Sequence, residues 1–134
     1  MFEWELLAKL AEWLRAGRAD RYADMIAKDQ ISEPDAFRDR LARASIAADW
    51  QAIATGSQRA DEPYARQAWC IWTLEQSLAT QEKRLARIAA TDPAFADHVD
   101  LRDGIAALLH LQRSSTGMLL VDLRVPPEPM RDVA

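Results

Sequence analysis

Apolar positions along residues 2–16 recur with the period of an α-helix. At about 100° per residue the apolar side chains fall on one continuous arc, and charged residues fill the other side. That arc consists of Phe2, Trp4, Leu6, Leu7, Leu10, Ala11, Trp13 and Leu14. Gly17 follows, at a position where helices commonly end. We expect this helix to pack on the core of its own domain. A partner's groove and a membrane surface are alternatives, and the acidic polar face argues against a membrane.

Two further helices are predicted on either side of a short turn. The first covers about residues 19–29, with an apolar side formed by Tyr22, Met25 and Ile26. Ser32 can cap the second, and Pro34 fits its first turn. We expect this helix to reach residue 54 and to carry one apolar stripe, Phe37, Leu41, Ala44 and Ala48, with Trp50 and Ile53 extending its apolar surface. Residues 55–63 are polar and read as a loop.

A long helix is predicted over about residues 62–90, with Asp61 as its cap. Apolar residues cover well over half of its circumference, so it should be covered on several sides. About 29 residues of helix span roughly 43 Å. A compact domain of this chain length is only about 36 Å across. The excess length predicts either an elongated protein or association with another chain, including a second copy.

The last helix should begin near Asp97 and pair with the long helix as an antiparallel hairpin. Its leucines continue in the same phase on both sides of residues 114–117, and this phase favours one helix running through. The later ones are Leu119, Leu120 and Leu123. A strand over residues 118–125 is the competing interpretation, and it would need a second chain to pair with.

Residues 125–134 form a proline-rich tail that should be extended rather than helical. The first five residues of this tail include three prolines, Pro126, Pro127 and Pro129. It is either a disordered end or a docking peptide for a partner, since an extended chain loses little entropy on binding.

The composition agrees with an all-α protein. Only four of the 134 residues are glycine, alanine is abundant, and β-branched residues are scarce. We expect an irregular bundle of about five helices, dominated by the hairpin of the last two, as a single domain over residues 1–124. The chain has one cysteine, no apolar run of membrane-spanning length, and none of the features of a signal peptide at its start. These features predict a cytoplasmic protein that does not enter a membrane.

Candidate chemistry is sparse. The two histidines, His98 and His110, belong to no metal-ligand spacing, and Cys70 has little nearby basic charge to activate it. Glu75 and Glu82 fall within the apolar arc of the long helix and could line a pocket, unless arginines pair with them or that face is solvated. We therefore predict no catalytic, cofactor or metal site.

Residues 25–42 resemble a helix-turn-helix in outline only. The second helix begins with acidic residues, which would face the DNA backbone, and the whole chain has a net charge of −4. A basic stripe nevertheless follows, formed by Arg38, Arg40 and Arg43. Nucleic-acid binding through residues 25–45, by a regulator or a phage-type packaging subunit, is thus the alternative function.

The favoured prediction is a non-catalytic protein–protein interaction module that works as an adaptor, inhibitor or assembly factor and associates with itself. Five tryptophans are many for this length, and tryptophan is enriched at interface hot spots. The candidate partner-binding residues are Trp4, Trp13, Leu119, Leu120, Leu123, Pro126, Pro127 and Pro129.

Overall fold

The protein is all-helical over the residues that its structure describes. A computed structural model describes residues 4–114, in which five helices account for all the regular secondary structure. In chain order they are α1 (Trp4–Ala16), α2 (Tyr22–Ala27), α3 (Glu33–Thr55), α4 (Gln67–Ala86) and α5 (Phe95–Ser114). The prediction of an all-α bundle of about five helices is confirmed.

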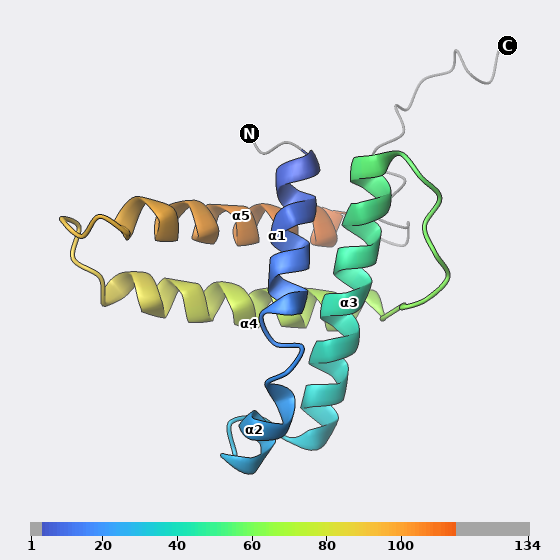
Figure 1. Cartoon of the computed structure of the whole chain (residues 1–134), viewed down its shortest axis with the longest axis horizontal. Helices are drawn as coiled ribbons and strands as arrows, with labels where there is room; N and C mark the ends of the chain where they lie inside the picture. The colour runs from blue at the N-terminus through green and yellow to red at the C-terminus, as the bar shows by residue number, and fades with distance from the viewer. Residues whose placement is uncertain (1–3, 115–134) are drawn as a thin grey trace, which may run out of the picture.

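The four longer helices form two antiparallel pairs that lie across each other (Figure 1). Helix α1 packs chiefly against α3, and α4 packs chiefly against α5. Contacts between α3 and α4 join the two pairs, and the short α2 packs near the beginning of α3. The turn of the α4–α5 hairpin lies beyond α1 and α3, so one end of this hairpin extends away from the other pair (Figure 1).

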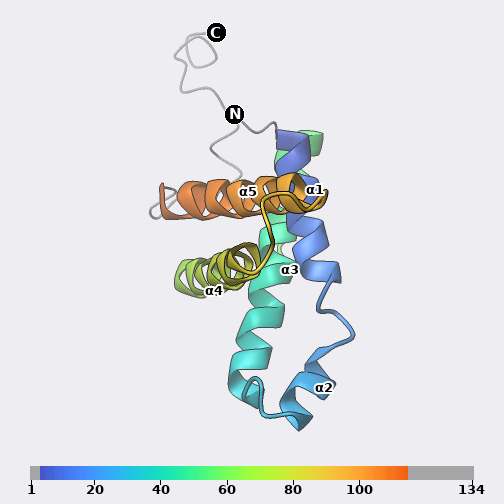
Figure 2. The same ribbon diagram turned by 90° about the vertical axis from the view of Figure 1, so that its left-hand side faces the viewer.

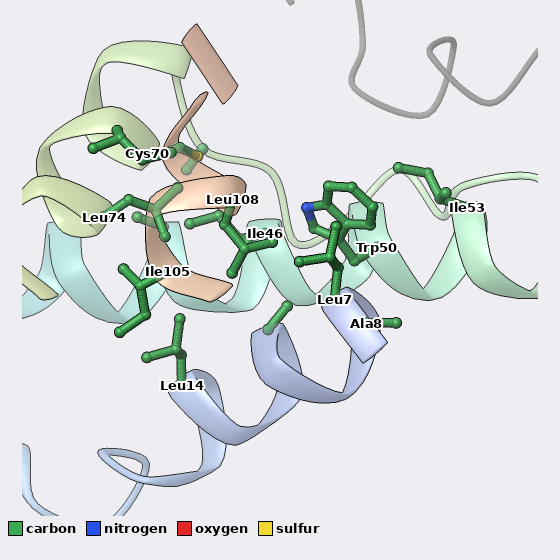
Figure 3. Close-up of a cluster of buried hydrophobic side chains, with 14 residues drawn as sticks. Leu7, Ala8, Leu14, Ile46, Trp50, Ile53, Cys70, Leu74, Ile105 and Leu108 are labelled. Atoms are coloured by element: carbon green, nitrogen blue, oxygen red, sulfur yellow. The ribbon is translucent and has the colours of Figure 1, made fainter. Parts of the chain in front are cut away.

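The core lies where the two pairs cross (Figure 3). Its most completely buried apolar side chains come from four helices and are Leu7, Ile46, Trp50, Leu74, Ile105 and Leu108. The ring of Trp4 covers Trp50 from α1, with centroids 5.5 Å apart. Each such side chain contributes about 1.5–3 kcal/mol by leaving water, so this cluster is the main source of stability.

Helix α3 begins as its sequence predicts. The hydroxyl of Ser32 accepts a hydrogen bond from the backbone N–H of Asp35 at 3.2 Å, and Pro34 lies in the first turn. The helix ends at Gly56, whose φ of 71° lies in the left-handed region that glycine adopts without strain.

The predicted apolar stripe of this helix is wrong. Phe37 is 52% exposed, and the other three members of the stripe are only partly buried. Trp50 and Ile53, which were predicted to extend the apolar surface, are buried, and so are Ala42 and Ile46, which the predicted stripe left out. The prediction failed because Asp39 and Arg43, which are polar, also occupy buried positions on the same helix.

Helix α4 is shorter than predicted at both ends, and Asp61 does not cap it. It starts at Gln67, after Arg66, whose side chain makes no capping hydrogen bond. Arg59 holds the preceding segment against α3, because it pairs with Asp49 and donates to the carbonyl of Pro63 at 2.6 Å. The observed 20 residues span roughly 30 Å, so the argument from a 29-residue helix no longer applies.

Polar side chains join α4 to α5 along the hairpin. Near one end the amide of Gln67 donates to the carbonyl of Gln112 at 2.7 Å. Toward the other end the amide of Gln81 donates to the carbonyl of His98 at 2.9 Å. These bonds satisfy polar groups of Gln81 and Gln112, two buried polar residues between the helices.

Residues 1–3 and 115–134 lie outside the described residues. The question of helix or strand over residues 114–125, the proline-rich tail, and the candidate residues from Leu119 onward therefore stay predictions. Among the helices of residues 4–114, none is both long enough and apolar enough to cross a membrane.

Candidate functional site

Helix α1 carries apolar side chains on two of its faces. One face holds Leu7, Ala11 and Leu14, which are buried in the core. On a different face, Leu6 and Trp13 keep 51% and 52% of their surface exposed. The helix therefore has more apolar surface than its contacts with α3 and α5 cover.

The two exposed side chains lie on one line along the helix. Leu6 and Trp13 are seven residues apart and project from nearly the same side. The partly buried Leu10 lies one turn after Leu6, between them. We call Leu6, Leu10 and Trp13 the α1 stripe.

The α1 stripe combines apolar side chains with charged neighbours. Single exposed leucines are ordinary, whereas contiguous apolar side chains on successive turns mark sites of association. Exposed Glu5, Lys9 and Glu12 provide charged surroundings on the same helix, as the polar rim does at protein interfaces. In Figure 2, α1 lies at the edge of the bundle, where a partner can approach it.

The two tryptophans predicted to bind a partner differ in their surroundings. Trp4 is 41% exposed, but one side of its ring covers Trp50, so it also closes the core. Trp13 is 52% exposed and belongs to the α1 stripe. Trp13 is therefore the better candidate for contact with another protein.

The structure removes one of the three arginines from the predicted nucleic-acid stripe. Arg43 is only 5% exposed, so it cannot extend to a phosphate backbone. Arg38 and Arg40 are exposed. The guanidinium of Arg38 lies near two groups of the protein itself, the Asp35 carboxylate at 3.7 Å and the Trp69 ring at 5.7 Å from its centroid.

Arg43 belongs to a buried polar cluster that joins three helices. Its Nε donates to the Asp39 carboxylate at 2.9 Å, one turn earlier on α3. Its terminal nitrogens donate to the carbonyl of Leu14 in α1 at 2.8 Å and to the hydroxyl of Ser77 in α4 at 3.0 Å. The guanidinium thus ties α1, α3 and α4 together where the two helix pairs cross.

Asp39 is the acceptor at the centre of this cluster and is 1% exposed. Besides Arg43, its carboxylate accepts hydrogen bonds from the hydroxyls of Tyr22 at 2.6 Å and Thr73 at 3.0 Å, and from Arg18 at 3.2 Å. Burial by itself raises the pKa of Asp39, but the charges of Arg43 and Arg18 and these hydrogen bonds outweigh it. The pKa of Asp39 is therefore lower than usual.

Burial shifts the pKa values of two neighbouring groups, Tyr22 and Arg43, in opposite directions. It raises the pKa of the Tyr22 hydroxyl, and the hydrogen bond to Asp39 adds to this effect, so Tyr22 stays protonated. It lowers the pKa of Arg43, against the attraction of Asp39, yet a guanidinium titrates so high that it remains charged. The cluster is therefore ionic, with two guanidinium groups, those of Arg18 and Arg43, sharing one carboxylate.

The carboxylates and the thiol considered from the sequence differ in their surroundings. Glu75 and Glu82 are both exposed, and Glu75 pairs with Arg113 of α5 at 2.6 Å. Glu82 lines an open pocket of about 340 Å³, together with Phe95 and Arg102 of α5. Cys70 is buried, and burial raises the pKa of its thiol to about 12, so the reactive thiolate is rare near neutral pH. Within residues 4–114 no three His, Cys, Asp or Glu side chains are grouped so that they could hold a metal ion.

Comparison of the chain with known protein families, with curated proteins and with solved structures finds no match. Of the residues predicted to bind a partner, Trp4 and Trp13 lie within the described part, and of these two only Trp13 lies on the same side of α1 as the exposed Leu6. Leu6 was predicted to face the core, and its exposure was missed. The width of the apolar arc over residues 2–16 was the available signal, because a helix packed on one side needs a narrower one.

Proposed function

We propose that the protein is a non-catalytic protein–protein interaction module, of the adaptor, inhibitor or assembly-factor kind, that binds through the α1 stripe. The exposure of Leu6 and Trp13 on one side of α1 carries the proposal. Covering an exposed side chain such as Leu6 contributes about 1–2 kcal/mol to the free energy of binding. An indole ring such as that of Trp13 is frequent among the residues that dominate binding at interfaces.

Self-association is part of the proposal. Two copies of α1 related by a two-fold axis can cover each other's stripe with the same residues, as closed homodimers do. The stripe alone is smaller than a standard interface, so we expect further residues to contribute to the contact. The projecting end of the α4–α5 hairpin offers such surface (Figure 1).

The absence of catalysis is likewise a proposal, and the chemistry of the described residues supports it. The buried Asp39 and Arg43 neutralise each other and join helices, and Cys70 is protonated and enclosed. These groups stabilise the fold in their present positions.

The test compares the self-association and partner binding of Leu6→Glu and Trp13→Glu with those of the unchanged protein. Ala23→Glu, at an exposed position of α2, is the matched control for an added charge. By analytical ultracentrifugation and by affinity capture from the native host, we expect the α1 variants to lose at least tenfold in affinity and the control to keep it. Equal association of all four proteins would refute binding through the α1 stripe.

A further inference from the structure

A pocket of about 370 Å³ opens beside the buried polar cluster. It is lined by the end of α1, by residues from Gly17 to Gln30, and by the second half of α4. In Figure 1 the end of α1 lies in front of α4 and above α2, and residues of these elements line the pocket. Its volume lies within the range of small-molecule binding sites.

The charges that line this pocket all have one sign. Four arginines contribute to its wall, Arg18, Arg21, Arg43 and Arg84. Among the described residues that line the pocket there is no aspartate or glutamate. Because the whole chain carries a net charge of −4, this concentration of arginine does not reflect a generally basic protein.

The hydrogen bonds of three of these arginines leave an excess of positive charge. Arg18 and Arg43 share the single carboxylate of Asp39. Arg84 donates to the side-chain oxygen of Gln81 at 2.9 Å, and this oxygen is uncharged. An excess of guanidinium groups around a partly enclosed space attracts oxyanions, which they bind by charge-assisted and often bidentate hydrogen bonds.

Apolar side chains complete the wall of the pocket. Trp13 and Met25 offer surface to an uncharged part of a ligand, next to the buried side chain of Ile105. We propose that this pocket binds a small organic anion through its phosphate or carboxylate group. Arg21 and Arg84 contact the anion, and Trp13 and Met25 contact the apolar part. This site is independent of the association proposed above, apart from the shared Trp13.

The proposal is tested by titration calorimetry at low ionic strength with inorganic phosphate, phenyl phosphate and benzoate. We expect phenyl phosphate to bind more tightly than inorganic phosphate, because only the former reaches the apolar wall. Comparison with benzoate identifies which anionic group the arginines prefer. Arg21→Gln and Arg84→Gln should each lower the affinity about tenfold, as expected for loss of a charged hydrogen bond.

Arg40→Gln is the control, because Arg40 is exposed on α3 and does not line the pocket. Thr80→Phe is a second test, since it fills the pocket without removing a charge. Thermal unfolding confirms that each variant is folded, and Leu6→Glu should keep the ligand affinity. No binding of any of the three anions at millimolar concentration, or equal losses in the Arg40 and Arg21 variants, would overturn the proposal.

Discussion

The guanidinium of Arg43 and the carboxylate of Asp39 form a buried ion pair on α3, with Nε and Oδ2 2.9 Å apart. The side chains are only 6% and 2% exposed, and they lie where the two helix pairs cross. A buried pair adds little stability compared with an apolar core, but each ion becomes costly once its partner is removed. The pair therefore makes the crossing of the helices sensitive to single substitutions.

Arg43→Ala should lower the free energy of unfolding by about 3 kcal/mol or more. The substitution leaves the Asp39 carboxylate buried with Arg18 as its remaining cationic partner, and it also removes bonds to α1 and α4. Urea denaturation followed by circular dichroism measures the change. Arg40→Ala, at an exposed position on the same helix, should cost about 0.5 kcal/mol or less. Similar losses in both variants would show that the buried pair is not formed.

The acid dependence of stability should differ in sign for the two buried aspartates of α3. The pKa of Asp39 lies below its ordinary value of 3.8, so the unfolded chain binds its proton more readily. Stability from Asp39 is therefore present above pH 3.8 and is lost as the pH falls through the lower pKa of the folded state. Burial raises the pKa of Asp49, despite the opposing effect of Arg59, so its contribution decreases as the pH rises from 3.8 through that raised pKa.

The measurement is urea denaturation at a series of pH values for the unchanged protein, Asp39→Asn and Asp49→Asn. The difference between the unchanged protein and Asp39→Asn should grow as the pH rises toward 3.8 and then level off. The corresponding difference for Asp49→Asn should shrink as the pH rises above 3.8. Parallel curves for the two variants would contradict the assigned directions of the pKa shifts.

Substitution of Trp50 should lower the stability of the fold, whereas substitution of Trp13 should mainly weaken association. Trp50 is fully buried, so Trp50→Ala should cost about 3–5 kcal/mol in the free energy of unfolding. Trp13 is half exposed, so Trp13→Ala should cost less than about 1 kcal/mol while weakening association. Thermal unfolding and sedimentation of both variants measure the two effects. If Trp13→Ala destabilised the monomer as strongly as Trp50→Ala, its side chain would belong to the core and not to an interface.

The sequence by itself determined that the chain is helical and approximately where its helices lie. Helix formation depends on the propensities of neighbouring residues and on local hydrogen bonds, and the cap at Ser32 is visible in a few letters. The beginning of α4 was misplaced, because the contacts of Arg59 with Asp49 and Pro63 come from a loop folded against another helix. The local sequence pattern around residues 61–67 does not predict a contact between these distant segments.

Only the tertiary structure decided which faces of the helices are covered. Arg43 was interpreted as part of an exposed basic stripe, yet the carbonyl of Leu14 and the hydroxyl of Ser77 enclose it from two other helices. Leu6 was assigned to the core, yet the crossing of the helix pairs leaves it in solvent. Both outcomes have one physical reason: burial and charge pairing depend on segments far away in the chain, whereas periodicity describes each helix separately.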